Sequence, residues 1–256
     1  MNQPTFKTKE ELEIMRYGGK ILGKILTELE KAVKPGITTD YLDKEAEKLF
    51  KFFNVQASFK GYRNFPKNIC VCINDEIVHG IPSPAKNIRE GDLVTIDCGV
   101  YYQGFHTDSA ISIGVGSISE EKKYFLETVK KTLINAIKLI KPGVRLGDLG
   151  SYIQRMIESK GYSIVRDLTG HGIGKNLHEA PVIYNFGKKN TGLALKPGMT
   201  LAIEPIVNMG QRFTKTLSDR WTIVSLDKSL SCQFEHTIAV TSTGYEVLTI
   251  RPNEII

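Results

Sequence analysis

Residues 34–50 read KPGITTDYLDKEAEKLF, and residues 141–157, which lie 107 positions further along the chain, read KPGVRLGDLGSYIQRMI. Each stretch starts with a Pro-Gly pair, which ends a helix, and continues with apolar residues at helical spacing. Because the two stretches align without a gap, they predict an internal duplication. The matching apolar positions are Leu42, Ala46, Leu49 and Phe50 in the first copy and Leu149, Ile153, Met156 and Ile157 in the second.

A long amphipathic helix is predicted before each of these stretches. The first begins at Thr8, where Thr-Lys-Glu-Glu has the capping-box pattern, and its apolar spacing continues to Val33. The second shows the same spacing from Phe125 to Ile140.

The correspondence also extends downstream of the two stretches. Asp97 corresponds to Glu204, again at 107 positions, and both stand in apolar segments. We therefore interpret the chain of residues 1–256 as a single domain built from two related halves, near residues 1–115 and 116–256.

Strands follow each pair of predicted helices, close together and joined by short loops. This order favours an α+β arrangement of antiparallel sheets with the helices packed outside, pseudo-twofold symmetry and a site between the halves. The predicted strands are LVTIDCGVYY (residues 93–102), FHTDSAISIGV (105–115), MTLAIEPIV (199–207) and CQFEHTIAVTS (232–242).

The composition is that of an ordinary globular protein, with 41% hydrophobic and 24% charged residues, which excludes a disordered chain. No stretch approaches the ~18 apolar residues of a membrane helix, and the start MNQPTFKTKEELEIM lacks a signal-peptide core. We therefore expect a cytoplasmic protein that does not enter a membrane.

The net charge of +6 is too modest to indicate a specific nucleic-acid partner. The four cysteines form no CxxC pair, so buried free thiols are expected.

Carboxylates stand where charges are unexpected. Asp97, Glu204 and Glu235 lie in segments apolar enough to be buried, and an unpaired buried carboxylate is costly. Asp97 and Asp108 lie on the two arms of a predicted hairpin. A turn at residues 102–103 would place them directly opposite each other, whereas a turn at residues 103–104 would make them diagonal neighbours.

In either arrangement two carboxylates share a small space, and a cation would offset their repulsion. The alternative is that both carboxylates reach solvent at a sheet edge.

His171 stands between glycines in TGHGIG (residues 169–174), which lets the backbone approach a ligand closely. Four carboxylates and one imidazole balance two divalent cations, and this donor set suits Mn, Fe, Co or Zn. His79 and His178 lie in Gly/Pro-rich loops near these residues, which favours a functional over a structural role.

Together these motifs resemble the methionine aminopeptidases of the short bacterial type I, over nearly the whole chain. The resemblance implies the duplicated "pita-bread" α+β fold, which the family shares with creatinase and prolidase, so the fold alone does not settle the function. The matching stretches are NDEIVHGIPSP (residues 74–84), IDCGVYYQGFHTDSA (96–110), RDLTGHGIGKNLHEAP (166–181), LKPGMTLAIEPIV (195–207) and SCQFEHTIAV (231–240).

The resemblance implies removal of the initiator methionine from nascent proteins and peptides when the second residue is small. It implies two divalent ions (Co, Mn, Fe or Zn) that activate a water for attack on the first peptide bond. Glu204 is implied to shuttle the proton, His178 to stabilise the oxyanion and His79 to contact the backbone of the second residue. The implied metal ligands are Asp97, Asp108, His171, Glu204 and Glu235.

The resemblance also places a methionine pocket. Leu177 stands where the family commonly has an aromatic residue, and Phe59, at the rim, where a small one is common. Cys98 and Thr107 also depart from the family pattern beside the ligands. These departures concern the shape of the pocket and not the metal chemistry. The implied pocket residues are Tyr62, Phe65, Cys70, Leu177 and Trp221.

Further expectations concern partners. The resemblance allows a monovalent cation near Asn74 and Ser231. The expected partners are Met-starting N-termini of peptides and nascent chains, with transient ribosome association and a monomeric state.

Rival interpretations predict different features. A proline-directed peptidase of the same fold usually carries an extra N-terminal domain, whereas this chain begins with the first repeat. A type II methionine aminopeptidase carries a helical insertion, for which 256 residues leave no room. A non-catalytic ribosome- or RNA-binding relative loses metal ligands, whereas all five are present here.

Overall fold

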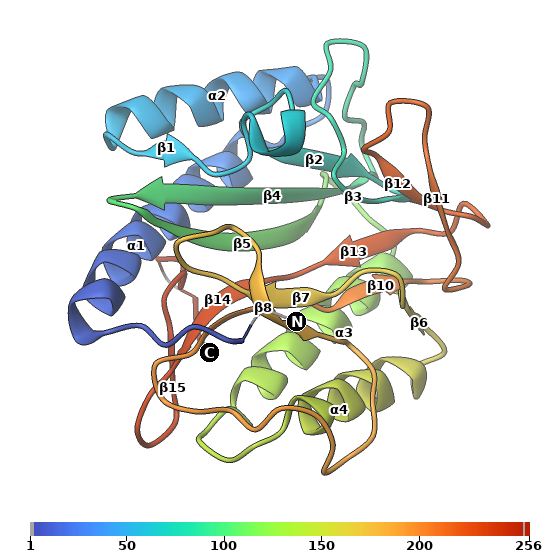
Figure 1. Cartoon of the computed structure of the whole chain (residues 1–256). Coiled ribbons are helices and arrows are strands. Elements are labelled where there is room, and N and C mark those ends of the chain that lie inside the picture. The colour runs from blue at the N-terminus through green and yellow to red at the C-terminus, as the bar shows by residue number, and fades with distance from the viewer. Residues whose placement is uncertain (1–2, 253) are drawn as a thin grey trace.

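The computed structural model describes residues 3–252 and 254–256. Helices pack outside antiparallel sheets, which confirms the predicted α+β fold (Figure 1). Among the described helices, none combines the length and the apolar character that a membrane crossing requires. The helices are α1 (Lys9–Ala32), α2 (Thr39–Phe52), α3 (Glu120–Ile137) and α4 (Leu146–Glu158), with a short helical turn η1 (Tyr62–Asn64).

The helix ends follow local hydrogen bonding. The Thr8 hydroxyl accepts a bond from the Glu11 amide (3.2 Å) and the Glu11 carboxylate accepts one from the Thr8 amide (2.9 Å), which confirms the capping box. The sequence pattern extended the second long helix to Ile140, but α3 ends at Ile137. The chain leaves the α-helix through a tighter turn, in which the Ile140 amide donates to the Ile137 carbonyl, and Ile140 remains buried.

Equivalent backbone bonds close the turn after the first helix of each pair. The Gly36 amide donates to the Ile88 carbonyl (2.8 Å), and the Gly143 amide donates to the Leu195 carbonyl (2.9 Å). The two glycines have nearly equal positive φ values of 89° and 90°, which suit glycine. All partners differ by 107 positions, so backbone contacts follow the sequence correspondence. The single domain and the boundary near residue 115 stay predictions.

Most of the strand pairing lies in two sheets. In the first, β4 (Leu93–Tyr102) pairs with β1 (Gln56–Ala57), β2 (Cys70–Ile73) and β5 (Phe105–Gly114). The second has the order β15-β14-β9-β7-β8, formed by β7 (Gly170–Gly172), β8 (Glu179–Ile183), β9 (Thr200–Ile203), β14 (His236–Val240) and β15 (Tyr245–Val247). The shorter strands are β3 (Glu76–Val78), β6 (Ser163–Ile164), β10 (Ile206–Asn208), β11 (Thr214–Thr216), β12 (Ile223–Ser225) and β13 (Ser231–Gln233).

Each helix pair has its own apolar core. Helices α1 and α2 bury their apolar faces against β2, β4 and β5, and α3 and α4 bury theirs against β9 and β14 (Figure 1). All four cysteines are free and buried, as predicted. The region where the two sheets meet therefore lies between two independently packed layers.

The register of the β4–β5 hairpin decides between the two predicted turns. Asp97 pairs with Ala110 and Asp108 with Gly99, so the turn lies at residues 103–104 and the two carboxylates are diagonal neighbours. Gln103 and Gly104 have positive φ values of 45° and 88°, as a two-residue hairpin turn of the primed type requires.

The prediction that Glu204 and Glu235 lie within continuous strands is wrong. Glu204 falls in the break between β9 and β10, and Glu235 falls in the break between β13 and β14. The β9–β14 pairing and the β10–β13 pairing lie on the two sides of this break and follow the same register. That register places Glu204 opposite Glu235. Pro205 cannot donate a ladder bond, and opposed like charges disfavour pairing, so the ladder opens here.

Helix α1 approaches the C-terminal segment closely, which generates a test of the packing. A Cβ atom at Gly19 would overlap the carbonyl group of Leu248, whereas one at Gly18 would lie 3.5 Å from its nearest neighbour, an ordinary contact. We expect Gly19→Ala to lower the free energy of unfolding by about 1–3 kcal/mol through overpacking. Gly18→Ala should leave it unchanged or raise it by up to about 1 kcal/mol, because alanine favours a helix interior. Urea unfolding of both variants measures this, and equal effects would contradict it.

Candidate active site

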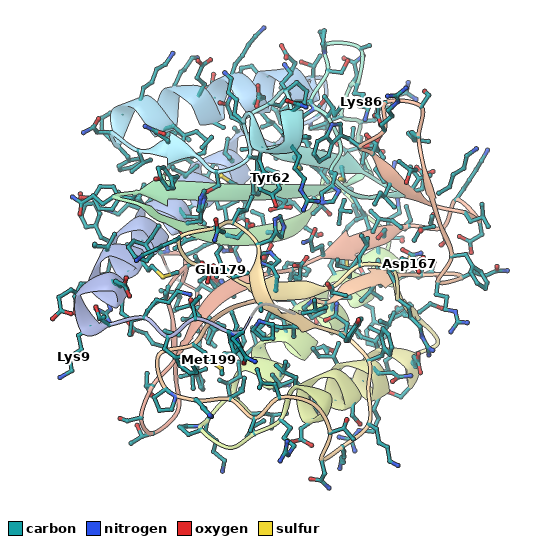
Figure 2. The ribbon with its side chains drawn as sticks, in the orientation of Figure 1. Lys9, Tyr62, Lys86, Asp167, Glu179 and Met199 are labelled. Carbon is teal, nitrogen blue, oxygen red and sulfur yellow. The ribbon has the colours of Figure 1, made fainter. Side chains whose placement is uncertain are left out.

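A cavity of about 910 Å³ opens where the two sheets meet. Figure 2 labels Tyr62 and Glu179, which come from segments far apart in the sequence and both line this cavity. The structure brings together every ligand, catalytic and pocket residue predicted from the sequence. These lining residues are Phe59, Tyr62, Phe65, Cys70, His79, Asp97, Asp108, His171, Leu177, His178, Glu204, Trp221 and Glu235.

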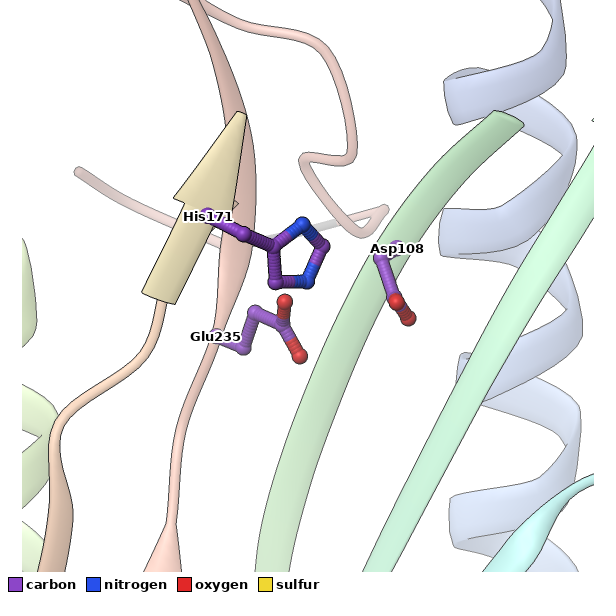
Figure 3. Close-up of side chains that lie close together, drawn as sticks. All are labelled: Asp108, His171 and Glu235. Carbon is purple, nitrogen blue, oxygen red and sulfur yellow. The ribbon is translucent and has the colours of Figure 1, made fainter. Parts of the chain in front are cut away.

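Three of these side chains converge from different elements. Asp108 comes from β5, His171 from β7 and Glu235 from the break between β13 and β14 (Figure 3). One potential ligand atom from each lies within 4.8 Å of those of the other two. All three residues are buried, so this group has the donors and the spacing that a metal ion needs.

The carboxylates repel one another electrostatically. Burial raises the pKa of Asp97 to about 7. Burial, reinforced by the neighbouring carboxylates, raises the pKa values of Asp108, Glu204 and Glu235 well above their usual range. Within the described part of the chain, Asp97 Oδ1 and Glu235 Oε1 are buried without a hydrogen-bond partner. Buried oxygens of this kind are costly unless a cation or a proton satisfies them, so the donor set fits divalent metal ions.

His171 presents one defined nitrogen to this cluster. Its Nδ1 lies 2.8 Å from the Gly172 carbonyl oxygen, which can only accept, so Nδ1 carries the proton. Its Nε2 lies 3.7 Å from Glu204 Oε1. Burial lowers the pKa of His171 to about 4, which keeps the ring neutral. A neutral imidazole with a free Nε2 is the form that coordinates a metal.

Gln233 also contributes to the site, although its sequence pattern did not predict this role. Its amide donates to Glu204 Oε2 (3.0 Å) and holds one oxygen of that carboxylate in place. The available signal was a buried amide two residues before Glu235 in an otherwise apolar segment.

Two hydroxyl groups link β5 to the segment that contains β13, Glu235 and β14. The sequence did not single them out. The Ser109 hydroxyl donates to the Glu235 carbonyl (2.6 Å), and the Glu235 amide donates to the Ala110 carbonyl (2.9 Å). The Thr237 hydroxyl accepts a bond from the Asp108 amide (2.9 Å) and donates to the Asp108 carbonyl (2.8 Å). The backbones of Asp108 and Glu235 are therefore fixed relative to each other.

His178 is held differently. Its side chain is exposed at the cavity, and its Nδ1 lies 2.8 Å from the Tyr62 hydroxyl. The next residue, Glu179, forms an ion pair with Lys7 (2.7 Å) and accepts a bond from the Asn176 amide (3.0 Å). The Lys7 and Glu179 side chains are only 4% and 5% exposed, so a buried ion pair anchors the loop that carries His178.

The predicted pocket residues form one apolar cluster. Phe59, Phe65, Cys70 and Leu177 are buried in it, and Tyr62 and Trp221 are partly buried against it. Phe65 and Trp221 meet edge to face with ring centroids 5.1 Å apart, and the ring of His79 approaches Trp221 at 6.0 Å. Burial raises the pKa of the Cys70 thiol, so it contributes as a neutral wall. Phe59 both packs in this core and lines the cavity.

The residues predicted beside a monovalent cation are also neighbours. The Ser231 amide donates to the Asn74 carbonyl (2.8 Å), and the Asn74 side chain donates to Asp92 (2.8 Å). Oxygen atoms from both segments are thus available at one place.

Comparison with known proteins agrees with this geometry. The chain matches the model of metallopeptidase family M24 over residues 13–242. Methionine aminopeptidase 1 of Bacillus subtilis (strain 168) is 46% identical over 243 residues, which cover 95% of this chain and 98% of that protein. The crystal structure of methionine aminopeptidase from Thermotoga maritima has a TM-score of 0.96 at 41% identity and covers 97% of this chain and 100% of that chain.

A prolidase from Pyrococcus horikoshii OT3 shares the fold with a TM-score of 0.77 at 26% identity. It covers 98% of this chain, but only 65% of that chain is matched. The likeness to methionine aminopeptidases is thus closer and extends over nearly the full length of both chains. The chain therefore belongs to metallopeptidase family M24 and, within it, to the methionine aminopeptidases, which are metal-dependent hydrolases that act on peptide N-termini.

Proposed function

We propose that this chain removes the initiator methionine from nascent proteins and peptides whose second residue is small, with two divalent metal ions. The observation that carries the proposal is the buried carboxylate–imidazole cluster on one side of a 910 Å³ cavity whose other side is an apolar, aromatic pocket. A metal centre beside an apolar pocket suits a peptide with a free N-terminus and an apolar first side chain. The preference for a small second residue rests on the likeness to the family.

The proposed ligands match the charge of two divalent ions. Four carboxylates offset four positive charges, and the unpartnered oxygens of Asp97 and Glu235 are available to coordinate. The mixed oxygen and imidazole donors suit Mn, Fe, Co or Zn. When bound, such ions lower the pKa of water and so supply a nucleophile near neutral pH. The proposed ligand set is Asp97, Asp108, His171, Glu204 and Glu235.

The remaining polar residues have distinct proposed roles. Glu204, with one oxygen held by Gln233, would accept the proton of the attacking water and pass it to the leaving amine. The protein that surrounds the cavity desolvates the His178 ring and, together with neighbouring groups such as His171, lowers its pKa to about 3, so the neutral ring has one N–H to donate to the oxyanion. His79, which lines the same cavity, would contact the backbone of the second substrate residue.

The aromatic pocket would bind the methionine side chain. A thioether is polarizable and makes favourable contacts with aromatic rings such as those of Tyr62, Phe65 and Trp221. Leu177 and Cys70 complete the apolar wall. The pocket would therefore select methionine by shape and by sulfur–aromatic contact.

We also propose that the chain works as a monomer in the cytoplasm, with a monovalent cation near Asn74 and Ser231. Its net charge of +6 would favour transient contact with the ribosome, where nascent chains emerge.

The direct test is peptidase activity after metal removal and reconstitution. Protein stripped with chelator and reloaded with Mn, Co, Fe or Zn should cleave Met-Gly-Met-Met and leave Pro-Gly-Met-Met intact. Metal content is measured alongside by elemental analysis. Absence of turnover with every one of these metals would overturn the proposed function.

The ligand cluster generates a second prediction. Asp108→Asn should abolish the rise in melting temperature that added Mn or Co gives the parent, because ligand binding stabilises the folded state. Without metal the same variant should be more stable than the parent, by roughly 0.5–2 kcal/mol, because one of the crowded carboxylates is gone. Differential scanning calorimetry with and without metal measures both effects. A metal-free variant less stable than its parent would contradict the repulsion argument.

His178→Ala separates rate from metal binding. The variant should retain both metals but lose about 10²-fold in kcat, the usual cost of removing an oxyanion donor. His106→Ala is the matched control, because His106 lies on β5 but bonds to Ser58 (3.0 Å) away from the ligands, and it should keep the parental kcat. Equal kcat values for His178→Ala and parent would refute the role of His178.

A further inference from the structure

We propose that Tyr62 is a positioning residue for His178: its hydroxyl donates to Nδ1, fixes the ring, and keeps the ring proton on Nε2, where it can be donated to the substrate oxyanion. This inference deepens the proposed function and rests on it, since it assumes that His178 stabilises the oxyanion. It gives the Tyr62 hydroxyl a role separate from that of its ring, which forms part of the pocket wall.

The ring of His178 lies against that of His171 with centroids 4.3 Å apart, but this contact does not select between the two nitrogens of the imidazole. The side chain is exposed at the cavity, whereas the preceding Leu177 is only 3% exposed and anchors the backbone. An exposed ring can rotate about its side-chain bonds unless a directional contact holds it. The hydrogen bond from Tyr62 (2.8 Å) is such a contact, and the two ring centroids lie 5.1 Å apart.

The role proposed for His178 sets the direction of this hydrogen bond, because a neutral ring that donates from Nε2 must accept at Nδ1. A neutral imidazole has one protonated and one unprotonated nitrogen, and the phenol hydroxyl can supply a proton to the unprotonated one. His178 Nδ1 lies 2.8 Å from the Tyr62 hydroxyl, a distance that suits a hydrogen bond in either direction. With Nδ1 as acceptor, the proton of His178 resides on Nε2. The opposite tautomer would leave Nε2 without a proton and unable to donate to an oxyanion.

The backbone around Tyr62 is held in an uncommon conformation. Gly61, Arg63 and Asn64 all have positive φ values, of 86°, 48° and 70°. Such values are uncommon for residues other than glycine and persist only where surrounding contacts impose them. Here the Gly61 amide donates to the Phe65 carbonyl (2.8 Å), which closes the loop and presents Tyr62 to the cavity. A loop constrained in this way is suited to placing one side chain accurately.

The Tyr62–His178 bond also spans the two halves of the sequence. Tyr62 precedes β2 in the first half, and His178 precedes β8 in the second. The Lys7–Glu179 ion pair also joins the two halves, but it anchors the backbone of the His178 loop, whereas the Tyr62 hydroxyl reaches the ring.

The test removes a single hydroxyl group. Tyr62→Phe keeps the aromatic wall, so KM for Met-Gly-Met-Met should stay within about twofold of the parent. The kcat should fall about tenfold, less than the ~10²-fold loss expected when a direct oxyanion donor is removed. In a His178→Ala background, adding Tyr62→Phe should change kcat by less than about twofold, because the group it positions is absent. Tyr101→Phe is the matched control, since Tyr101 packs against the ring of His106 (4.6 Å) while His106 Nδ1 bonds to Ser58.

The ring tautomer supplies a readout independent of turnover. In ¹⁵N-histidine-labelled metal-free protein, the His178 signals, assigned by their loss in His178→Ala, should show protonated Nε2 and unprotonated Nδ1. Tyr62→Phe should shift these signals toward a mixture of tautomers, and Tyr101→Phe should not.

Three results would overturn the inference: an unchanged kcat in Tyr62→Phe, an equal loss of kcat in the parent and His178→Ala backgrounds, or protonated Nδ1 in the parent. If the parent cleaves Met-Gly-Met-Met and Tyr62→Phe has the same kcat, this inference is rejected and the proposed function is not. A parent without activity under every metal condition rejects the proposed function instead.

Discussion

The structure depends on a repulsive constraint: four carboxylates crowd together where the β4–β5 hairpin meets the interrupted pairing of β9–β10 with β13–β14. Burial and mutual repulsion raise the pKa values of Asp108, Glu204 and Glu235, so the folded chain stores an unfavourable interaction there. The surrounding structure offsets it. Two separate apolar cores hold the layers. The Ser109 hydroxyl satisfies the Glu235 carbonyl at the break, and the Thr237 hydroxyl bonds to the Asp108 backbone on β5.

The duplicated architecture explains how such a cluster arises. Asp97 and Asp108 come from a hairpin of the first half, where the register makes them diagonal neighbours. Glu204 and Glu235 come from the second half and face each other across the break, so each half brings a carboxylate pair to the region between the sheets. Neither pair resolves its own repulsion. Bringing both pairs to one place with the neutral imidazole of His171 creates a site whose charge only a cation of high valence, or protonation, can balance.

Helical spacing, Pro-Gly stops and misplaced carboxylates are local signals, and from them and the family resemblance the sequence predicted the fold class and a set of side chains that the structure brings to one cavity. It could not predict how the strands end at Glu204 and Glu235, since apolar residues on both sides of each carboxylate look like one continuous strand. It also missed Gln233, Ser109 and Thr237. Their roles depend on contacts between residues more than 25 positions apart, such as Thr237 with Asp108, and the local sequence does not show these contacts.

The site combines two degrees of rigidity, and the difference follows from what each group must do. The carboxylates and His171 are held through backbone contacts and burial, which suits ligands whose spacing must not change. His178 is exposed at the cavity. The buried Lys7–Glu179 pair anchors its backbone, the Tyr62 hydroxyl contacts its Nδ1, and its ring lies against that of His171 with centroids 4.3 Å apart. In the role proposed for His178, a group that donates to a charge formed transiently on the substrate needs access to the cavity, and access limits the packing that could orient it. Directional hydrogen bonding then complements ring packing, and under this proposal the hydroxyl of a pocket-wall tyrosine supplies it where a phenylalanine could not.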